Sequence, residues 1–205
     1  GMERNDPVWT VMGCRTLGVT CSWLGEWIAA RDHLERGLLL YDLAHRPRSY
    51  VELTVDETHV ILLTYLAWTL LCLGYVDQAR AKREAALAEA RLSRAFTLAH
   101  ALSRATHAEV IAVGPSGALL HADELVSLTE RQSIGIFFAE AMAVQGWCLT
   151  MLGQPSRYSN RSASNRRVLG PTKMVFGLAI ACSRAARLGV SPTIPRSCES
   201  PEPTR

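Results

Sequence analysis

The chain has 205 residues, which is enough for one domain of ordinary size with a buried core. Hydrophobic residues make up 48% and charged residues 20%, a composition that excludes a disordered chain and favours a globular one. The net charge of +3 is too small to indicate nucleic acid or a membrane surface as a partner, so we expect neither. Aromatic residues are few, at 7%, while Ala and Leu are abundant, which favours helices over strands.

Six cysteines are widely spaced and include no CxxC pair: Cys14, Cys21, Cys72, Cys148, Cys182 and Cys198. A disulfide scaffold would be shorter and denser in cysteine, and a structural zinc site would need paired ligands. Free thiols in a reducing compartment are the simpler interpretation. The chain begins Gly1-Met2 and soon enters helix-like sequence without a secretion signal, so we expect a cytoplasmic piece of a longer protein.

Pairs of an apolar residue and a glycine divide the chain at regular intervals. The glycines are Gly25, Gly74, Gly114, Gly153 and Gly189, so the gaps are 49, 40, 39 and 36 residues. These gaps lie near the period of about 34 residues that is typical of tetratricopeptide repeats, with insertions added. The spacing predicts an all-α, right-handed solenoid of antiparallel helical hairpins over residues 8–153, in which each hairpin buries its apolar face against the next.

The first unit carries the finer pattern. It has the spacing W-x2-L-G-x2-Y, followed after a turn by an aromatic residue, A-x3-F and a small residue. The matching residues are Cys14, Leu17, Gly18 and Cys21 before the turn, and Trp27, Ala30, Leu34 and Gly37 after it. Small residues let paired helices approach and large apolar ones fill the space between them. We therefore expect a helical hairpin whose turn lies at Leu24-Gly25.

The second unit repeats the pattern 49 residues later. Its apolar positions are Leu63, Leu66, Ala67 and Leu70 before the Leu73-Gly74 turn, and Val76, Ala79 and Ala86 after it. Arg83 stands where an apolar residue would be usual. Thr54-x-x-Glu57 has the form of a capping box and predicts a helix from about Val55. The residues from 42 to 54 contain a proline and predict a long connecting loop.

The third and fourth units are weaker. We predict helices over 98–113 and 118–131 with a turn at 114–117, in which Ser116 is the N-cap. The fourth unit begins with apolar or small residues at first-helix spacing, namely Met142, Gly146, Leu149 and Leu152. Residues 154–170 then form an irregular basic segment rich in Ser, Arg and Asn, where a second helix is due.

A terminal or isolated helix is expected over 171–189, and a disordered tail over the proline-rich residues 190–205. Three explanations of the basic segment compete. It is a loop that binds nucleic acid or a protein partner, an ordinary solvated linker, or the product of a slip of the reading frame near Gln154. We prefer the last, because two second helices are missing after intact first helices.

No pattern in the chain predicts catalysis or a metal site. The six histidines have no HExxH or comparable spacing, so we expect no metal and no cofactor. The sequence Gly114-Pro-Ser-Gly117 is not the GxSxG nucleophile elbow, and no strand precedes it. The uncharged run from Val60 to Val76 is long enough for a membrane span, but the repeat pattern already accounts for its apolar positions as a buried helix.

The candidate binding residues lie on the first helices of the units. Aligning these helices places five large side chains toward the inner groove: Arg15, Trp23, Trp68, Arg104 and Trp147. Trp and Arg are the residues that most often anchor interfaces. The alternative is that the tryptophans only fill space between repeats.

Two stretches carry a family resemblance, LGEWIAARDHLERGLLLYD at 24–42 and YLAWTLLCLGYVDQARAKREAALAEARL at 65–92. They resemble the tetratricopeptide-like C-terminal region of large bacterial signalling proteins that join a class III adenylate/guanylate cyclase domain to an AAA-type ATPase module. The resemblance covers about residues 10–153. It implies a regulatory solenoid rather than a catalytic domain, since the chain has no GxxxxGK[ST] loop and no strand-rich domain with metal-binding carboxylates.

From the pattern and the resemblance together we expect a non-enzymatic regulatory or interaction solenoid, whose partner is a protein, a peptide or another domain of its parent protein. Two alternatives remain open. One is a ligand-sensing helical segment of an ATPase-type transcriptional regulator, and the other is a remnant of a decayed gene without function.

Overall fold

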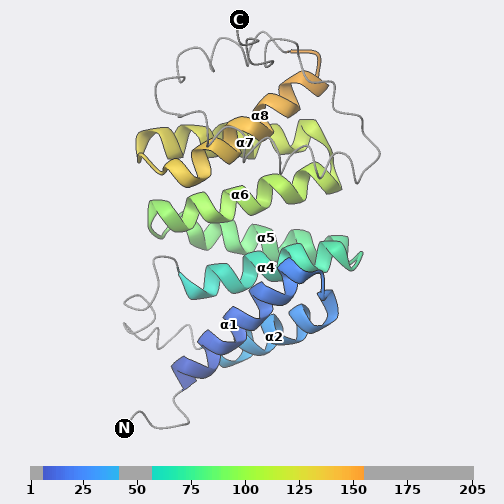
Figure 1. Cartoon of the computed structure of the whole chain (residues 1–205), viewed down its shortest axis with the longest axis vertical. Coiled ribbons are helices and arrows are strands. Elements are labelled where there is room, and N and C mark those ends of the chain that lie inside the picture. The colour runs from blue at the N-terminus through green and yellow to red at the C-terminus, as the bar shows by residue number, and fades with distance from the viewer. Residues whose placement is uncertain (1–6, 42–56, 155–205) are drawn as a thin grey trace, which may run out of the picture.

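A computed structural model describes residues 7–41 and 57–154 of the chain (Figure 1). Within these residues it has seven helices and no strand, so the all-α prediction is confirmed. The helices are α1 (Pro7–Leu24), α2 (Trp27–Leu40), α4 (Thr58–Cys72), α5 (Val76–Ala90), α6 (Ala95–Ala112), α7 (Pro115–Arg131) and α8 (Gly135–Met151).

Four of the five predicted glycine turns lie in the described residues, and all four glycines have the left-handed backbone that the pattern requires. Their φ angles are 82° at Gly25, 89° at Gly74, 97° at Gly114 and 72° at Gly153. A side chain is unfavourable at such angles, so glycine ends each first helix there. The fifth turn, at Gly189, is outside the described residues.

The helices stack in order along the long axis of the molecule, from α1 and α2 at one end to α7 and α8 at the other (Figure 1). Each of α1, α4 and α6 packs against the helix that follows it in the chain. α4 also contacts both helices of the preceding hairpin, and α6 contacts α4, α5 and α8. Contacts therefore run mainly between neighbours in the stack, as expected when each hairpin buries its apolar face against the next. The tetratricopeptide assignment and the superhelical arrangement remain predictions.

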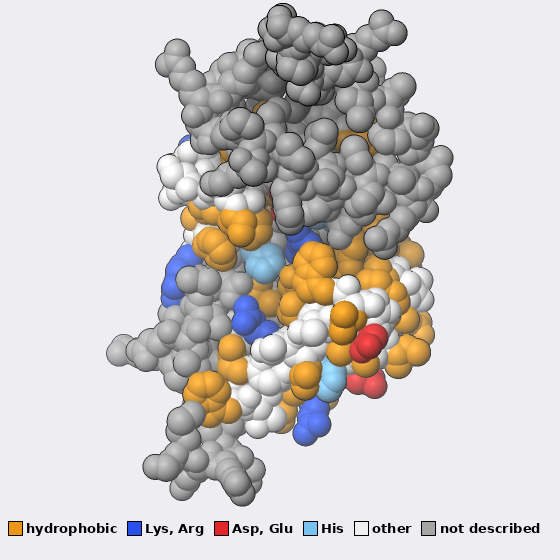
Figure 2. Space-filling view, viewed as in Figure 1, with side chains coloured by type: hydrophobic (Ala, Val, Ile, Leu, Met, Phe, Trp, Pro, Cys, Tyr) orange, Lys and Arg blue, Asp and Glu red, His pale blue; other side chains and the backbone are white. Residues whose placement is uncertain are grey.

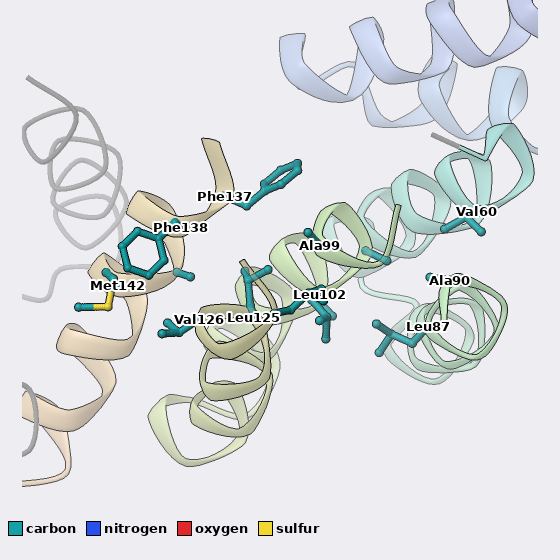
Figure 3. Close-up of a cluster of buried hydrophobic side chains, with 14 residues drawn as sticks. Val60, Leu87, Ala90, Ala99, Leu102, Leu125, Val126, Phe137, Phe138 and Met142 are labelled. Carbon is teal, nitrogen blue, oxygen red and sulfur yellow. The ribbon is translucent and has the colours of Figure 1, made fainter. Parts of the chain in front are cut away.

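Two apolar clusters make up most of the core. One joins α1 and α2 to α4 and includes Leu34 and Leu66, which are 0% and 1% exposed. The other runs from α4 to α8 and contains Leu102, Leu125 and Phe138, as Figure 3 shows. The first-unit pattern has a direct structural basis, because a Cβ atom on Gly37 would lie 2.9 Å from a methyl group of Leu62 in α4. A larger residue at position 37 would push the first two hairpins apart.

Some local predictions are wrong. The helix expected from about Val55 begins at Thr58, with Glu57 as N-cap and without a side-chain capping bond. Ser116 is not the N-cap of α7. Gly114 takes that place, and Pro115 is the first helical residue because its missing N–H is not needed there.

Leu17 of the first-unit pattern is also not packed into the core, since it is 50% exposed. The predictions for the loop over 42–54, the basic segment from 155 to 170, the helix over 171–189 and the tail over 190–205 all fall outside the described residues, so the proposed slip of the reading frame does too.

Candidate interaction surface

A row of ring contacts crosses the first helices of the stack. Trp23 on α1 meets Tyr65 on α4 edge-on, with the ring centroids 6.5 Å apart. Tyr65 meets His100 on α6 at 5.9 Å, and His100 meets Phe137 on α8 at 5.5 Å. Tyr65 and Phe137 are buried, whereas Trp23 is 59% exposed. The row is therefore part of the core along most of its length and opens to solvent at Trp23.

Arg104 on α6 reaches this open end. Its guanidinium carbon lies 5.5 Å from the centroid of the Trp23 ring, within the range of a cation–π contact. The same guanidinium donates hydrogen bonds to Glu140 on α8 at 2.7 Å and to the hydroxyl of Ser103 at 2.9 Å. Ser103 in turn donates to the other carboxylate oxygen of Glu140 at 2.8 Å. Arg104 is therefore held in one position and its charge is balanced.

His107 completes this polar group, because its Nε2 atom lies 3.2 Å from the Glu140 oxygen that also accepts from Arg104. The side chains of Arg104 and His107 are 12% and 8% exposed. A carboxylate shared by so many donors is firmly oriented. Glu140 was not predicted from the sequence. A single Glu on α8 gives no indication that Arg104 and His107 on α6 lie beside it.

The structure brings some of the five predicted residues together and separates others. Trp23 and Arg104 are in contact, and Trp68 and Arg104 line the same small gap between α4, α5 and α6. Trp147 packs elsewhere, with Val110 and Leu119 around a separate apolar cluster. Arg15 is half-buried on α1. Trp147 thus lies apart from Trp23 and Arg104 and packs against α6 and α7.

The gap beside Trp68 is small. It has a volume of about 10 Å³, and a second gap nearby, lined by Leu71 and Arg83 among others, has about 20 Å³. Each is of the size that holds a water molecule, whereas drug-sized and cofactor-sized ligands occupy about 300 Å³ or more. Neither gap can therefore serve as a small-molecule pocket in this conformation.

Buried ionic contacts between helices are the feature that the sequence least revealed. Arg83 on α5 pairs with Glu109 on α6 at 2.6 Å, with side chains 15% and 10% exposed. This explains why a charged residue stands at a position where the repeat pattern has an apolar one. His121 on α7 lies close by, and its pKa is lowered below the ordinary value, first by burial and then by the positive charge of Arg83.

A second such contact joins α4 to α5. His59 Nδ1 lies 2.6 Å from a carboxylate oxygen of Glu89, and the ring of Tyr41 stacks on His59 with centroids 4.9 Å apart. The sequence showed the histidines but gave no spacing that would have paired them with Glu residues 30 or more positions away. The packing of two helices within a hairpin, as at His59 and Glu89, or between neighbouring hairpins brings such residues together.

The described residues offer little for covalent or metal chemistry. Burial raises the pKa of the Cys148 thiol to about 12, and the carboxylate of Asp123 adds to the shift, so this thiol stays protonated at neutral pH. Cys14 and Cys21 are buried in packing positions, as predicted. Across residues 7–41 and 57–154, no group of three or more His, Cys, Asp or Glu side chains is placed to hold a metal ion. None of the described helices is both long enough and apolar enough to cross a membrane.

Comparison with known proteins adds no assignment: no protein-family model and no curated protein matches the chain. A relationship to cyclase- and ATPase-linked helical regions stays a prediction that rests on the resemblance of the stretches at 24–42 and 65–92.

Proposed function

We propose that the chain is a non-catalytic scaffold of stacked helical hairpins that binds a protein or peptide segment on the face around Trp23 and Arg104. It serves as the regulatory solenoid of a bacterial cyclase- or ATPase-type signalling protein, in keeping with the resemblance of residues 24–42 and 65–92. In this role it acts by holding a partner or a neighbouring domain in place, and it needs no cofactor of its own.

The observation that carries the proposal is the exposed ring of Trp23 with Arg104 fixed against it. A Trp side chain that is 59% exposed presents a large apolar surface to water, which favours burial by a partner. Arg104 is pre-oriented by Glu140 at 2.7 Å, so little conformational entropy is lost when a partner docks on it. Trp and Arg are also the residue types most enriched among interface anchors.

The pairing of Arg104 with Glu140 limits the kind of partner segment that we expect to bind. Because Glu140 neutralises Arg104, the surface does not select for a strongly acidic segment. We expect an apolar or aromatic side chain of the partner to lie against the Trp23 ring, with polar backbone groups beside the guanidinium. The ligand-sensing alternative is not favoured by any feature of the described helices, since the gaps between α4, α5 and α6 hold no more than a water molecule.

A peptide selection tests the proposal. A random peptide library displayed on phage is selected against the immobilised chain, and the enriched peptides are synthesised and titrated by calorimetry. Trp23→Ala should weaken their binding by about tenfold or more, because a central aromatic anchor contributes about 2 kcal/mol or more. Arg104→Lys should weaken binding less, because it keeps the charge and loses the planar contact with the ring.

Leu120→Ala is the control, since Leu120 is a large apolar residue that is 72% exposed on α7 and was not assigned to the groove. Its peptide affinity should equal that of the unaltered chain. Selection that enriches no peptide, or peptides that bind Trp23→Ala as tightly as the unaltered chain, would overturn the proposal.

A further inference from the structure

One side of α1 is exposed and carries no charged side chain. We call it the α1 outer face, formed by Trp9, Gly13, Thr16, Leu17, Thr20 and Leu24. Trp9, Leu17 and Leu24 are 46%, 50% and 68% exposed. Figure 2 shows the surface over α1 as hydrophobic and uncharged polar atoms, with charged side chains toward its margins. Exposed apolar residues gathered on one helix face are typical of an interaction surface.

The equivalent face of α4 is buried, and the register between the two helices is well defined. Both helices end at a left-handed glycine, Gly25 or Gly74, and both close with the same backbone hydrogen bond across the turn, 2.9 Å from Glu26 N to Cys21 O and 2.9 Å from Tyr75 N to Leu70 O. The offset is therefore 49 residues. This offset aligns four residues of the α1 outer face with four residues of α4: Trp9, Gly13, Leu17 and Thr20 with Thr58, Leu62, Leu66 and Thr69. The four α4 residues are 0%, 0%, 1% and 0% exposed.

The preceding hairpin covers this face of α4. Thr58 contacts the sulfur of Met12 at 3.6 Å, and the hydroxyls of Thr69 and Ser22 are 3.0 Å apart. The same position on the later first helices is also covered. Leu102 on α6 lies 40 residues after Leu62, and Ala141 on α8 lies 39 residues after Leu102; they are 0% and 1% exposed. Among the described first helices, α1 alone leaves its outer face open.

The α1 outer face is complementary to itself when two copies of α1 run antiparallel. A two-fold axis between Thr16 and Leu17 places Trp9 opposite Leu24 of the partner subunit, and Gly13 opposite Thr20 of the partner subunit. Leu17 of each copy then lies beside the axis, Gly13 and Thr20 leave room for close approach on either side, and Trp9 and Leu24 fill the ends of the contact. None of the six residues of the α1 outer face carries a charge, so the contact between these residues buries no charged group.

We propose that the chain forms a two-fold homodimer through the α1 outer face. Such an interface uses the same patch on both copies and closes without leaving a free face, which is the commonest arrangement of soluble oligomers. It buries one helix face per chain, which is small for an obligate dimer, so the association depends on concentration. The proposal does not rest on peptide binding at Trp23.

Sedimentation of the full chain over a range of concentrations tests the proposal. The unaltered chain should shift from the mass of one chain to the mass of two as its concentration rises. Leu17→Lys places two like charges next to the axis and should weaken the dimer by more than about tenfold. Leu92→Lys is the control, because Leu92 is 91% exposed at the end of α5 and away from α1. It should dimerise like the unaltered chain.

Crosslinking checks the register in a chain whose Cys72, Cys182 and Cys198 are replaced by Ser. A Thr16→Cys variant should then oxidise to a covalent dimer, because residue 16 lies beside the axis, whereas Leu92→Cys should not. A chain that stays monomeric at the highest soluble concentration overturns the proposal. So does a dimer that survives Leu17→Lys unchanged, because it uses another surface.

Discussion

An apolar cluster lies in each half of the stack, but the two halves differ in the polar contacts that join their helices. Between the first hairpin and α4, the contacts are apolar and hydroxyl ones, such as Leu62 against Gly37 and Ser22 beside Thr69. Among α5, α6, α7 and α8, buried ion pairs cross from helix to helix, as at Arg83–Glu109. The same arrangement of hairpins thus accommodates either a close apolar fit or a pairing of charges at its interfaces.

The difference has consequences for stability. An apolar interface depends on fit, so it is sensitive to the loss of volume and insensitive to pH. A buried ion pair depends on both partners, because removing one leaves the other charged and desolvated. The interface of α1 and α2 with α4 should therefore respond mainly to truncation, whereas the helices from α5 to α8 should also respond to changes of charge and pH.

Truncation of Leu66 tests the apolar end and has the largest expected effect. Leu66 is 1% exposed in the cluster that joins α1, α2 and α4. Leu66→Ala should lower the free energy of unfolding by about 2–5 kcal/mol, because it removes buried methyl groups and leaves a cavity. The measurement is a urea titration followed by circular dichroism.

Leu39→Ala serves as the control, since Leu39 is 86% exposed on α2. Its effect should stay within about 0.5 kcal/mol. Equal, small losses for both variants would show that Leu66 does not lie in a core.

Removal of Glu109 tests the ionic end. Glu109→Ala leaves Arg83 without its partner at an interface where the two side chains are 15% and 10% exposed. We expect a loss of about 2–3 kcal/mol, somewhat below the range for fully buried pairs because some solvent still reaches the site. The readout is again urea unfolding.

Glu124→Ala is the matched comparison, because Glu124 also pairs with an Arg of α5 but in an exposed pair, with Arg91 and Glu124 47% and 37% exposed. It should lose less than about 1 kcal/mol. If both Glu variants lose the same amount, burial does not distinguish the two pairs and the contrast between the two ends is wrong.

The pH dependence of stability should follow His121. Its pKa is lowered in the folded chain, first by burial and then by Arg83, with Glu109, Glu124 and Arg91 as the other charges that act on it. Below its ordinary pKa of 6.5, the unfolded chain therefore binds a proton that the folded chain does not. Stability from this group is full above that value and is lost as the pH falls further.

His121→Phe should flatten the decline in unfolding free energy between about pH 7.5 and about pH 5.5. The comparison is made by urea titrations of both proteins at each pH. Leu39→Ala, at a position 86% exposed on α2, is the control, because it removes no titratable group and should leave the slope unchanged. A His121→Phe variant with the slope of the unaltered chain would refute the assignment.

The parts of the fold that sequence revealed are those set by local chemistry. Gly25 and Gly74 could be recognised because a left-handed turn needs glycine, and Leu34 because one helix face repeats at fixed spacing. Trp23 and Arg104 were placed on one face by aligning helices, and they do meet. Partners such as Glu140 were missed, because their selection depends on how far one hairpin is shifted along the next. No local pattern encodes that shift.

The turn at Ser133 was also not recognised from the sequence. Replacing Ser133 has the smallest expected effect on the free energy of unfolding. It has a φ of 55° between α7 and α8, where the other three turns of this closing pattern carry glycine. Nothing local marked it as a turn residue.

Ser133→Gly should raise the free energy of unfolding by about 0.5 kcal/mol, because relief of the left-handed strain exceeds the extra entropy that glycine loses on folding. Ser127→Gly, at an exposed position inside α7, should instead lower it by about 0.5–1 kcal/mol. Opposite signs for the two substitutions in urea titrations would establish that backbone conformation at position 133 is the cause, and a loss at both positions would contradict it.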